Sequence, residues 1–195
     1  MLEIRIHGRG GQGNVVAAYL LAMAAFEEGR YGLAFPNFGA ERRGAPVMAF
    51  VRIADKPIRR RDQVRTPAFL IVQDEALLHV PGVMEGLLTG GRILVNSNRS
   101  GQELSQHYDK PIMSIAASSL AQQILGRPVP NTALLAAFAT LTQILSQESL
   151  RKVLHQRFKG SVLERNLQLI QTAAEQVPAG LWATTDQPEP TLTTS

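Results

Sequence analysis

The sequence predicts a three-layer α/β domain with a largely parallel β-sheet. Two continuous apolar runs of strand length, FLIVQD (69–74) and RILVN (92–96), are typical of strands buried on both faces. Stretches with helical apolar spacing alternate with such strands, and this alternation favours parallel strands joined by crossover helices. A glycine-rich turn joins the first strand to the first helix. We therefore expect a Rossmann-like domain that ends in C-terminal helices.

The first strand and helix lie in EIRIHGRGGQGNVVAA (3–18). Apolar and polar residues alternate from Ile4 to His7, as in a short buried strand. Four glycines then interrupt the pattern before a helical one begins, and that helix is predicted to end near Gly29.

The later elements follow from the same signals of apolar spacing and of glycine and proline breaks. Residues 47–53 are apolar on both strand faces, so this strand should be central or nearly so. Asp74 is placed to cap a short helix. Further strands are predicted within 30–38, 47–53, 69–74, 92–96 and 111–115. Further helices are predicted within 82–88, from Ser118 or Ser119 to 125, and within 131–145, 148–158 and 161–176.

The length of 195 residues fits one domain, which we place at residues 1–178. Residues 179–195 are rich in Thr, Pro and Gln and are expected to form a disordered tail. The chain shows no apolar run long enough to cross a bilayer and no export signal at its start, so we expect a cytoplasmic protein without a membrane partner.

Composition narrows the possible chemistry. The net charge of +4 and the sequence pI near 9.8 suggest an anionic partner, but only 6% of residues are aromatic, which argues against nucleic acid. The absence of cysteine excludes disulfides, a thiol nucleophile and a cysteine-ligated cluster in this chain. The four histidines lack metal-like spacing, so no metal site is expected.

The glycine turn is the main candidate binding site. Glycines leave backbone N–H groups unobstructed at a helix N-terminus, which is a site for anions. Gly8, Gly10 and Gly13 fit the G-x-G-x-x-G spacing of dinucleotide folds, but YGLAFPNF (31–38) lacks the acidic residue that would hold the ribose of NAD. The candidate residues are Gly10, Gly11, Gln12 and Gly13. The alternative is a tight turn that binds nothing.

Other loops can contribute charge to this site. Arg42 and Arg43 stand between Gly39 and Gly44, and such a short loop could aim a guanidinium at a phosphate or at a partner's carboxylate. They could equally be a solvated pair, as could the arginines of 59–61. Asn131 is first of all a predicted helix cap, although it could also touch a ligand beside the strand ends.

Four motifs, in this order and spacing, resemble the gamma subunit of 2-oxoacid:ferredoxin oxidoreductases, most closely that of pyruvate:ferredoxin oxidoreductase. They are HGRGGQG (7–13), FPNFGAERRGAPVMAFVRI (35–53), VQDEALL (72–78) and GRPVPNTALLAAFA (126–139). The resemblance spans about residues 1 to 175. Ala40 stands where the family pattern has proline, and Asn14 where it has a small apolar residue.

The resemblance implies a subunit of an enzyme that converts pyruvate, coenzyme A and oxidised ferredoxin to acetyl-CoA, carbon dioxide and reduced ferredoxin. Alpha, beta and delta-type subunits would be its partners, and ferredoxin would bind through the complex. Thiamine diphosphate and the iron–sulfur clusters would lie on partner subunits. Coenzyme A would be the co-substrate associated with this chain, which would hold no catalytic residue.

Three alternatives stay open at this point. The chain could serve an oxidoreductase for another 2-oxoacid, such as 2-oxoglutarate or a branched-chain one. It could also be a stand-alone nucleotide-binding regulatory module, although no G-x-x-x-x-G-K-[ST] loop is present. Finally, it could be a purely structural subunit whose glycine turn only packs.

Overall fold

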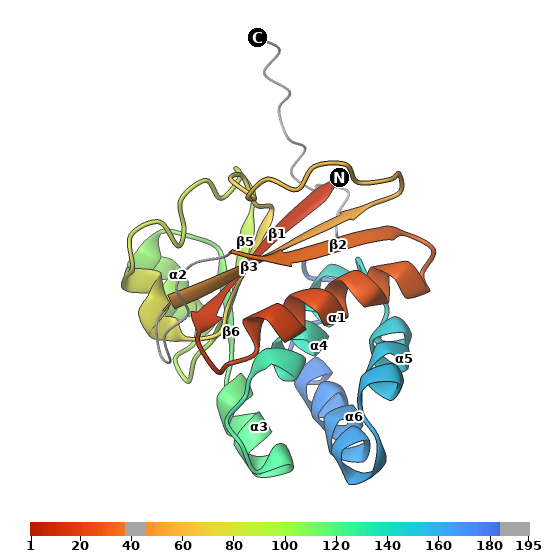
Figure 1. Ribbon diagram of the computed structural model, residues 1–195. Helices are drawn as coiled ribbons and strands as arrows, with labels where there is room; N and C mark the ends of the chain where they lie inside the picture. Colours follow the sequence, from red (N-terminus) through yellow and green to blue (C-terminus); the bar gives the residue numbers. More distant parts are fainter. Residues whose placement is uncertain (38–45, 184–195) are drawn as a thin grey trace.

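The computed structural model describes residues 1–37 and 46–183 (Figure 1). Six strands form one sheet in the order β2-β3-β1-β4-β5-β6. The strands are β1 (Leu2–Arg9), β2 (Tyr31–Pro36), β3 (Pro46–Ala54), β4 (Phe69–Val72), β5 (Arg92–Asn96) and β6 (Ile112–Ile115).

The pairs β1–β4, β4–β5 and β5–β6 are parallel, whereas β3 is antiparallel to both of its neighbours, β1 and β2. Only a short connection separates β2 from β3, and antiparallel pairing is the arrangement that such a connection allows, because parallel neighbours require a long crossover. The predicted α/β class with a largely parallel sheet is confirmed. The strand predicted to be central, β3, lies in the interior of the sheet between β2 and β1.

Most helices cover one face of the sheet, and α2 lies on the other (Figure 1). The helices are α1 (Asn14–Glu27), α2 (Gly101–Tyr108), α3 (Ala117–Leu125), α4 (Asn131–Thr142), α5 (Gln147–Arg157) and α6 (Gly160–Ala174), with a 3₁₀ turn η1 (Glu75–His79). None of the helices within the described residues is long and apolar enough to span a membrane.

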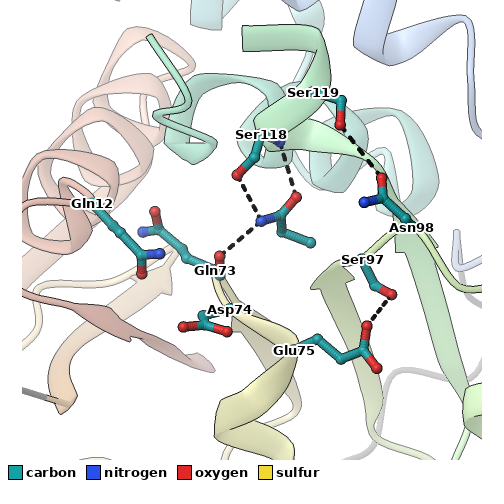
Figure 2. Close-up of a pocket in the computed structure, with 9 residues that line it drawn as sticks. Gln12, Gln73, Asp74, Glu75, Ser97, Asn98, Ser118 and Ser119 are labelled. Atoms are coloured by element: carbon teal, nitrogen blue, oxygen red, sulfur yellow. Dashed lines mark hydrogen bonds between the residues drawn. The ribbon is translucent and has the colours of Figure 1, made fainter. Parts of the chain in front are cut away.

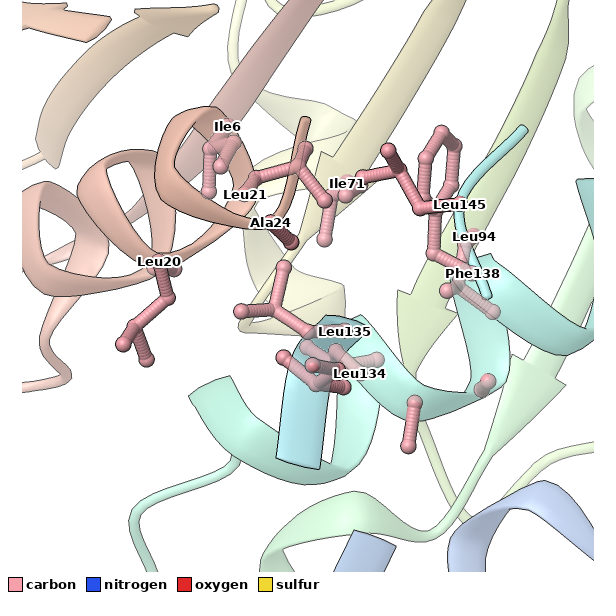
Figure 3. Close-up of a cluster of buried hydrophobic side chains, with 14 of the residues drawn as sticks. Ile6, Leu20, Leu21, Ala24, Ile71, Leu94, Leu134, Leu135, Phe138 and Leu145 are labelled. Atoms are coloured by element: carbon pink, nitrogen blue, oxygen red, sulfur yellow. The ribbon is translucent and has the colours of Figure 1, made fainter. Parts of the chain in front are cut away.

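The larger core lies between the sheet and the helical layer (Figure 3). Leu21 and Ala24 of α1 face the sheet, whereas Leu134, Leu135 and Phe138 come from α4. Almost every residue of α4 is buried, which agrees with its apolar sequence on all sides. This helix therefore forms the centre of the helical layer.

The predicted helix over residues 82–88 is wrong, because this segment forms turns. Gly82 and Gly86 have φ angles of 88° and 72°, a left-handed conformation that a helix interior does not accept. A side chain at Gly86 would also meet the Arg65 carbonyl oxygen at 2.0 Å.

Helix α2 was not predicted, although the sequence contains its start signal. Ser100 accepts a hydrogen bond from the Glu103 N–H, and the Glu103 carboxylate accepts one from the Ser100 N–H. This reciprocal pair is a capping box, and its S-x-x-E pattern is readable in the sequence.

The predicted cap of α3 is also wrong. The residue before the helix is Ala116, which provides no side-chain cap, and Ser118 lies within the first turn. Its N–H donates instead to Asn96 Oδ1 at 2.9 Å. A side chain from the end of β5 thus caps α3, which local sequence does not reveal.

The packed chain continues beyond residue 178, where the sequence analysis placed the start of a disordered tail. Trp182 is buried, and its ring centroid lies 6.0 Å from that of Phe69. Its backbone N–H donates to the Leu141 carbonyl. The indole supplies apolar area that the neighbouring Thr and Pro residues lack. Residues 184–195 lie outside the described residues.

Candidate functional site at the carboxyl ends of the strands

The glycine turn follows β1 directly and reverses the chain into α1. Two hydrogen bonds close it: the Gln12 N–H donates to the Arg9 carbonyl at 3.1 Å, and the Arg9 N–H donates to Gln12 Oε1 at 2.7 Å. Gly11 and Gly13 have φ angles of 94° and 79°. Both values favour glycine, so the turn has this shape because of its sequence.

The N-terminus of α1 remains open to an anion. Gly13 is the capping residue and offers no side chain, and the first turn of α1 contains no acidic residue. The first N–H groups of the helix and its dipole therefore keep their positive character at this end. Gly11 is exposed, and a Cβ built on it would meet nothing within 4 Å.

Asn14 anchors this helix start to the sheet. Its side chain is buried, and its Nδ2 donates to the Val47 carbonyl of β3 at 2.8 Å. A Cβ at Gly8 would lie 2.2 Å from Asn14 Oδ1, so the glycine makes room for this amide. Asn14 thus adds a contact between the start of the helix and the sheet.

The structure brings Asn131 to the turn. The residue opens α4, and its Nδ2 lies 3.5 Å from the Gly13 carbonyl oxygen. Its Oδ1 accepts from the Thr132 N–H at 2.8 Å, while the capping position belongs to Pro130. Asn131 is buried and packs closely against Gly13. A Cβ on Gly13 would lie 2.5 Å from the Asn131 amide nitrogen, so only glycine fits at this position.

Arg42 and Arg43 lie outside the described residues. The residues that flank their segment belong to this end of the sheet: Pro46 pairs with Arg9 at the end of β1, and the Asn37 N–H donates to the Met48 carbonyl. The prediction that the arginine loop shares the site stays a prediction.

A cavity of about 330 Å³ opens beside the turn, at the carboxyl ends of β4 and β5 (Figure 2). In parallel α/β sheets ligands bind outside these strand ends. Sequence analysis identified only one of its lining residues, Gln12, as a site residue. The cavity is lined by Gln12, Gln73, Asp74, Glu75, Asn96, Ser97, Asn98, Ser118 and Ser119.

Asn96 holds the cavity wall together. Its Nδ2 donates to the Gln73 carbonyl at 3.0 Å and to Ser118 Oγ at 2.8 Å, and its Oδ1 accepts from the Ser118 N–H. One amide thus ties the end of β4 to the start of α3. The signal that could have indicated these residues is their position, because Gln73 and Asn96 stand at the ends of two apolar strands.

The two carboxylates in the lining are both engaged. Asp74 pairs with Arg9 and accepts from the Ala76 N–H at 3.0 Å, so its predicted role as a cap is confirmed. Glu75 accepts from the Ser97 hydroxyl and pairs with Arg99 at 3.2 Å. These contacts fix the loops that surround the cavity.

His7 lies in β1 just before the turn. It is 3% exposed, and burial, assisted by the nearby Arg5 charge, lowers its pKa from 6.5 to about 3. The imidazole is therefore neutral at physiological pH. Its Nε2 has no hydrogen-bond partner within residues 1–37 and 46–183.

Comparison with known proteins assigns this fold and turn to a family. The family model of the pyruvate ferredoxin/flavodoxin oxidoreductase matches residues 3–176. The pyruvate synthase subunit PorC of Methanothermobacter thermautotrophicus is 48% identical over 177 residues, which cover 91% of this chain and 96% of the relative. A common gamma subunit of the pyruvate/ketoisovalerate oxidoreductases of Thermococcus kodakarensis is 46% identical over 176 residues, covering 89% and 95% of the two chains.

A solved structure agrees with the sequence match. The pyruvate oxidoreductase subunit PORC of Thermotoga maritima superposes with a TM-score of 0.80 at 36% identity, and the match covers 89% of this chain and 95% of that one. The chain therefore belongs to the pyruvate ferredoxin/flavodoxin oxidoreductase family.

Proposed function

We propose that this chain is the gamma subunit of a pyruvate:ferredoxin oxidoreductase and that its glycine turn binds the phosphates of coenzyme A. The observation that carries the proposal is the open N-terminus of α1, without acidic residues and with Gly11 exposed, in a chain of this family. A pyrophosphate is the kind of group that such a helix start attracts.

The remaining chemistry belongs to partner subunits in this proposal. Pyruvate loses carbon dioxide, the acetyl group passes to the sulfur of coenzyme A, two electrons go to ferredoxin, and the thiol proton is released. Thiamine diphosphate would stabilise the carbanion, and iron–sulfur clusters would carry the electrons on alpha, beta and delta-type subunits. The chain has no cysteine for a cluster.

The contribution of this chain would be positioning. The backbone N–H groups of Gly10, Gly11 and Gly13 would hold the phosphates, while the Gln12 N–H closes the turn on the Arg9 carbonyl. The arginines 42 and 43 would add charge from the neighbouring loop. Asn131 would support Gly13 from behind. A coenzyme held at this site presents its thiol to an intermediate formed on a partner, which replaces a random encounter with an oriented one.

The test is a Gly11→Ala change in this chain of the assembled complex, with coenzyme A binding measured by titration calorimetry. Alanine is strained at the positive φ angle of Gly11, and its methyl group would occupy the space through which the phosphate approaches. Loss of a charge-assisted contact costs about 1.5–3 kcal/mol, so affinity should fall roughly ten- to a hundredfold.

Gly29→Ala is the matched control. Gly29 ends α1 at its other end, has a φ angle of 73°, and also faces open space. It therefore carries the same backbone strain far from the turn. Equal coenzyme A affinities in the two variants would show that the turn binds no phosphate, and a complex that assembles without this chain would reject the subunit role.

A second candidate substrate comes from one relative. The Thermococcus kodakarensis relative is named as common to pyruvate and ketoisovalerate oxidoreductases. A gamma subunit that holds only the coenzyme could likewise serve catalytic subunits for branched-chain 2-oxoacids. Coenzyme A-dependent ferredoxin reduction with pyruvate and with 2-ketoisovalerate, measured on complexes purified through this chain, separates the two candidates.

A further inference from the structure

Helix α1 carries no charged side chain between Asn14 and Phe26, where its sequence reads NVVAAYLLAMAAF. A surface helix of a soluble protein normally has polar residues on its solvent side, whereas a helix that is apolar on all sides is normally buried. Helix α4 is apolar on all sides and is buried almost completely. Helix α1 has the same kind of sequence, but it lies on the outside of the molecule (Figure 1).

Three large apolar side chains of α1 are exposed in one row. Tyr19, Met23 and Phe26 are 49%, 38% and 76% exposed. Residues three and four positions apart lie on the same face of a helix, so the three side chains are neighbours. Leu21 and Ala24 lie on the opposite face and belong to the core. We call Tyr19, Met23 and Phe26 the α1 stripe.

The α1 stripe stands on a rigid support. The helix packs directly on β2, because a Cβ on Gly32 would lie only 2.2 Å from the Ala22 carbonyl oxygen. Asn14 ties the start of the helix to β3 through its hydrogen bond to the Val47 carbonyl. A partner that binds the α1 stripe therefore meets a surface that needs little ordering, which reduces the entropic cost of association.

The row of apolar side chains indicates a protein interface. Single exposed apolar residues are ordinary on protein surfaces, whereas a contiguous row without intervening charge marks a place where another surface docks. A charged group pressed against this row would lose its hydration without gaining a counter-charge. The surface that covers the α1 stripe must therefore be apolar and uncharged.

Other occupants fit the α1 stripe less well. A helix that lies on a membrane carries lysine and arginine beside its apolar face, and α1 contains neither. Residues 184–195 of the chain itself offer one large apolar side chain, Leu192. A second copy would bury too little: with about 150–250 Å² for each large side chain, two stripes bury roughly 600 Å². A stable interface buries at least about 1,200 Å².

We propose that the α1 stripe docks onto an apolar surface of another subunit of the same oxidoreductase, with Phe26 as its main anchor. Phe26 is the most exposed of the three side chains, and aromatic anchors contribute most of the binding energy in protein interfaces. This inference rests on the proposed function, because it requires that the chain is a subunit of a larger complex. The α1 stripe would form the centre of a wider contact.

The test is Phe26→Glu in the chain co-expressed with the other subunits of its complex and purified through a tag on this chain. Sedimentation velocity over a dilution series gives the concentration at which half of the complex is assembled. A carboxylate in an apolar interface loses its hydration, so this concentration should rise at least about thirtyfold, the loss expected at an aromatic anchor. Phe26→Leu keeps an apolar side chain and should weaken assembly much less.

Two controls separate docking from folding. Val162→Glu makes the same kind of change at a 44% exposed position of α6 and should assemble as the wild type does. Because Phe26 is mostly exposed in the chain itself, the isolated Phe26→Glu chain should unfold at the wild-type temperature. If it unfolds at a lower temperature, Phe26→Gln, which adds no charge, takes its place and should also weaken assembly.

The outcomes separate this inference from the proposed function. Wild-type assembly of Phe26→Glu, or an equal loss in Val162→Glu, would show that the α1 stripe is not the docking surface. A dimer of the isolated wild-type chain that Phe26→Glu abolishes would show that a second copy covers the α1 stripe, and the inference would be wrong. If the wild-type chain purifies without the other subunits, the proposed function fails, and the inference fails with it.

Discussion

At β1 and β3, the two faces of the sheet carry chemically different side chains. On the helical face, β1 and β3 present Ile4, Ile6 and Val51 to α1 and α4, and these side chains are fully buried. On the opposite face the same strands present charged and polar side chains that are also almost fully buried. These are Arg5, His7 and Arg52, with exposures of 7%, 3% and 0%.

Over β1 and β3, loops rather than helices cover the polar side chains, whereas α2 packs on the same face over the later strands. Arg5 donates to the Val83 carbonyl at 3.0 Å, and Arg52 donates to the Arg60 carbonyl at 3.0 Å. Arg52 also pairs with Glu3, which lies directly opposite it in the sheet, at 2.7 Å. Guanidinium groups thus satisfy backbone carbonyls of irregular segments that apolar side chains would leave unpaired.

The largest effect is expected on the helical face. Phe138 is 0% exposed and packs edge-on against Phe69, with ring centroids 5.3 Å apart. Phe138→Ala should lower the free energy of unfolding by about 3–5 kcal/mol, because it leaves a cavity in the core. Urea unfolding measures this loss, and Tyr19→Ala, at a 49% exposed position, is the control. A similar loss in both variants would contradict this description of the core.

Removing Arg52 from the polar face should lower the free energy of unfolding somewhat less than Phe138→Ala does. Arg52→Ala leaves the Glu3 carboxylate without its partner, and breaking a fully buried pair costs about 3–5 kcal/mol. Since 12% of the Glu3 side chain is accessible, we expect about 2–4 kcal/mol in urea unfolding. The double variant Glu3→Gln, Arg52→Met should recover part of this loss. A double variant less stable than Arg52→Ala would show that the pair itself holds the face together.

His7 should make the polar face sensitive to acid. Its pKa is lowered from 6.5 in the unfolded chain to about 3 in the folded one, so between these values the unfolded state binds more protons. The stability that comes from keeping His7 neutral is therefore present above pH 6.5, and it is lost as the pH falls towards 3. By pH 5 the loss should reach about 2 kcal/mol.

The measurement is the free energy of unfolding from pH 7.5 to 5 for the wild type and for His7→Leu. Subtracting the two curves removes other titrating groups, and the difference should show the loss. His155→Leu changes an exposed histidine and should keep the wild-type slope. Parallel curves for wild type and His7→Leu would mean that His7 is accessible to protons in the folded protein.

The same contrast explains what the sequence could predict. Strand β5 was predicted with its observed bounds, because an apolar run between glycines and polar residues indicates a buried strand without help from distant segments. Arg5 and His7 had the alternation of a strand with one solvated side. The burial of Arg5 depends on the segment around Val83, to whose carbonyl it donates, and this segment has no periodicity.

The candidate site divides in the same way. The turn over Gly10–Gly13 could be predicted, because glycine spacing after a strand is a local signal. The cavity could not, since Gln73, Asn96 and Ser118 come from three separate segments that meet only in the folded chain.

The most direct test of the central claim is the ratio of coenzyme A dissociation constants between complexes that contain Gly11→Ala and Gly29→Ala chains. Because the two variants share their backbone strain, the ratio isolates the phosphate contact. We predict a ratio of roughly ten to a hundred at low salt, and this ratio should fall towards one as added salt screens the attraction between the helix N-terminus and the phosphates. A ratio near one at every salt concentration would contradict the assignment of the coenzyme A site to this end of the sheet.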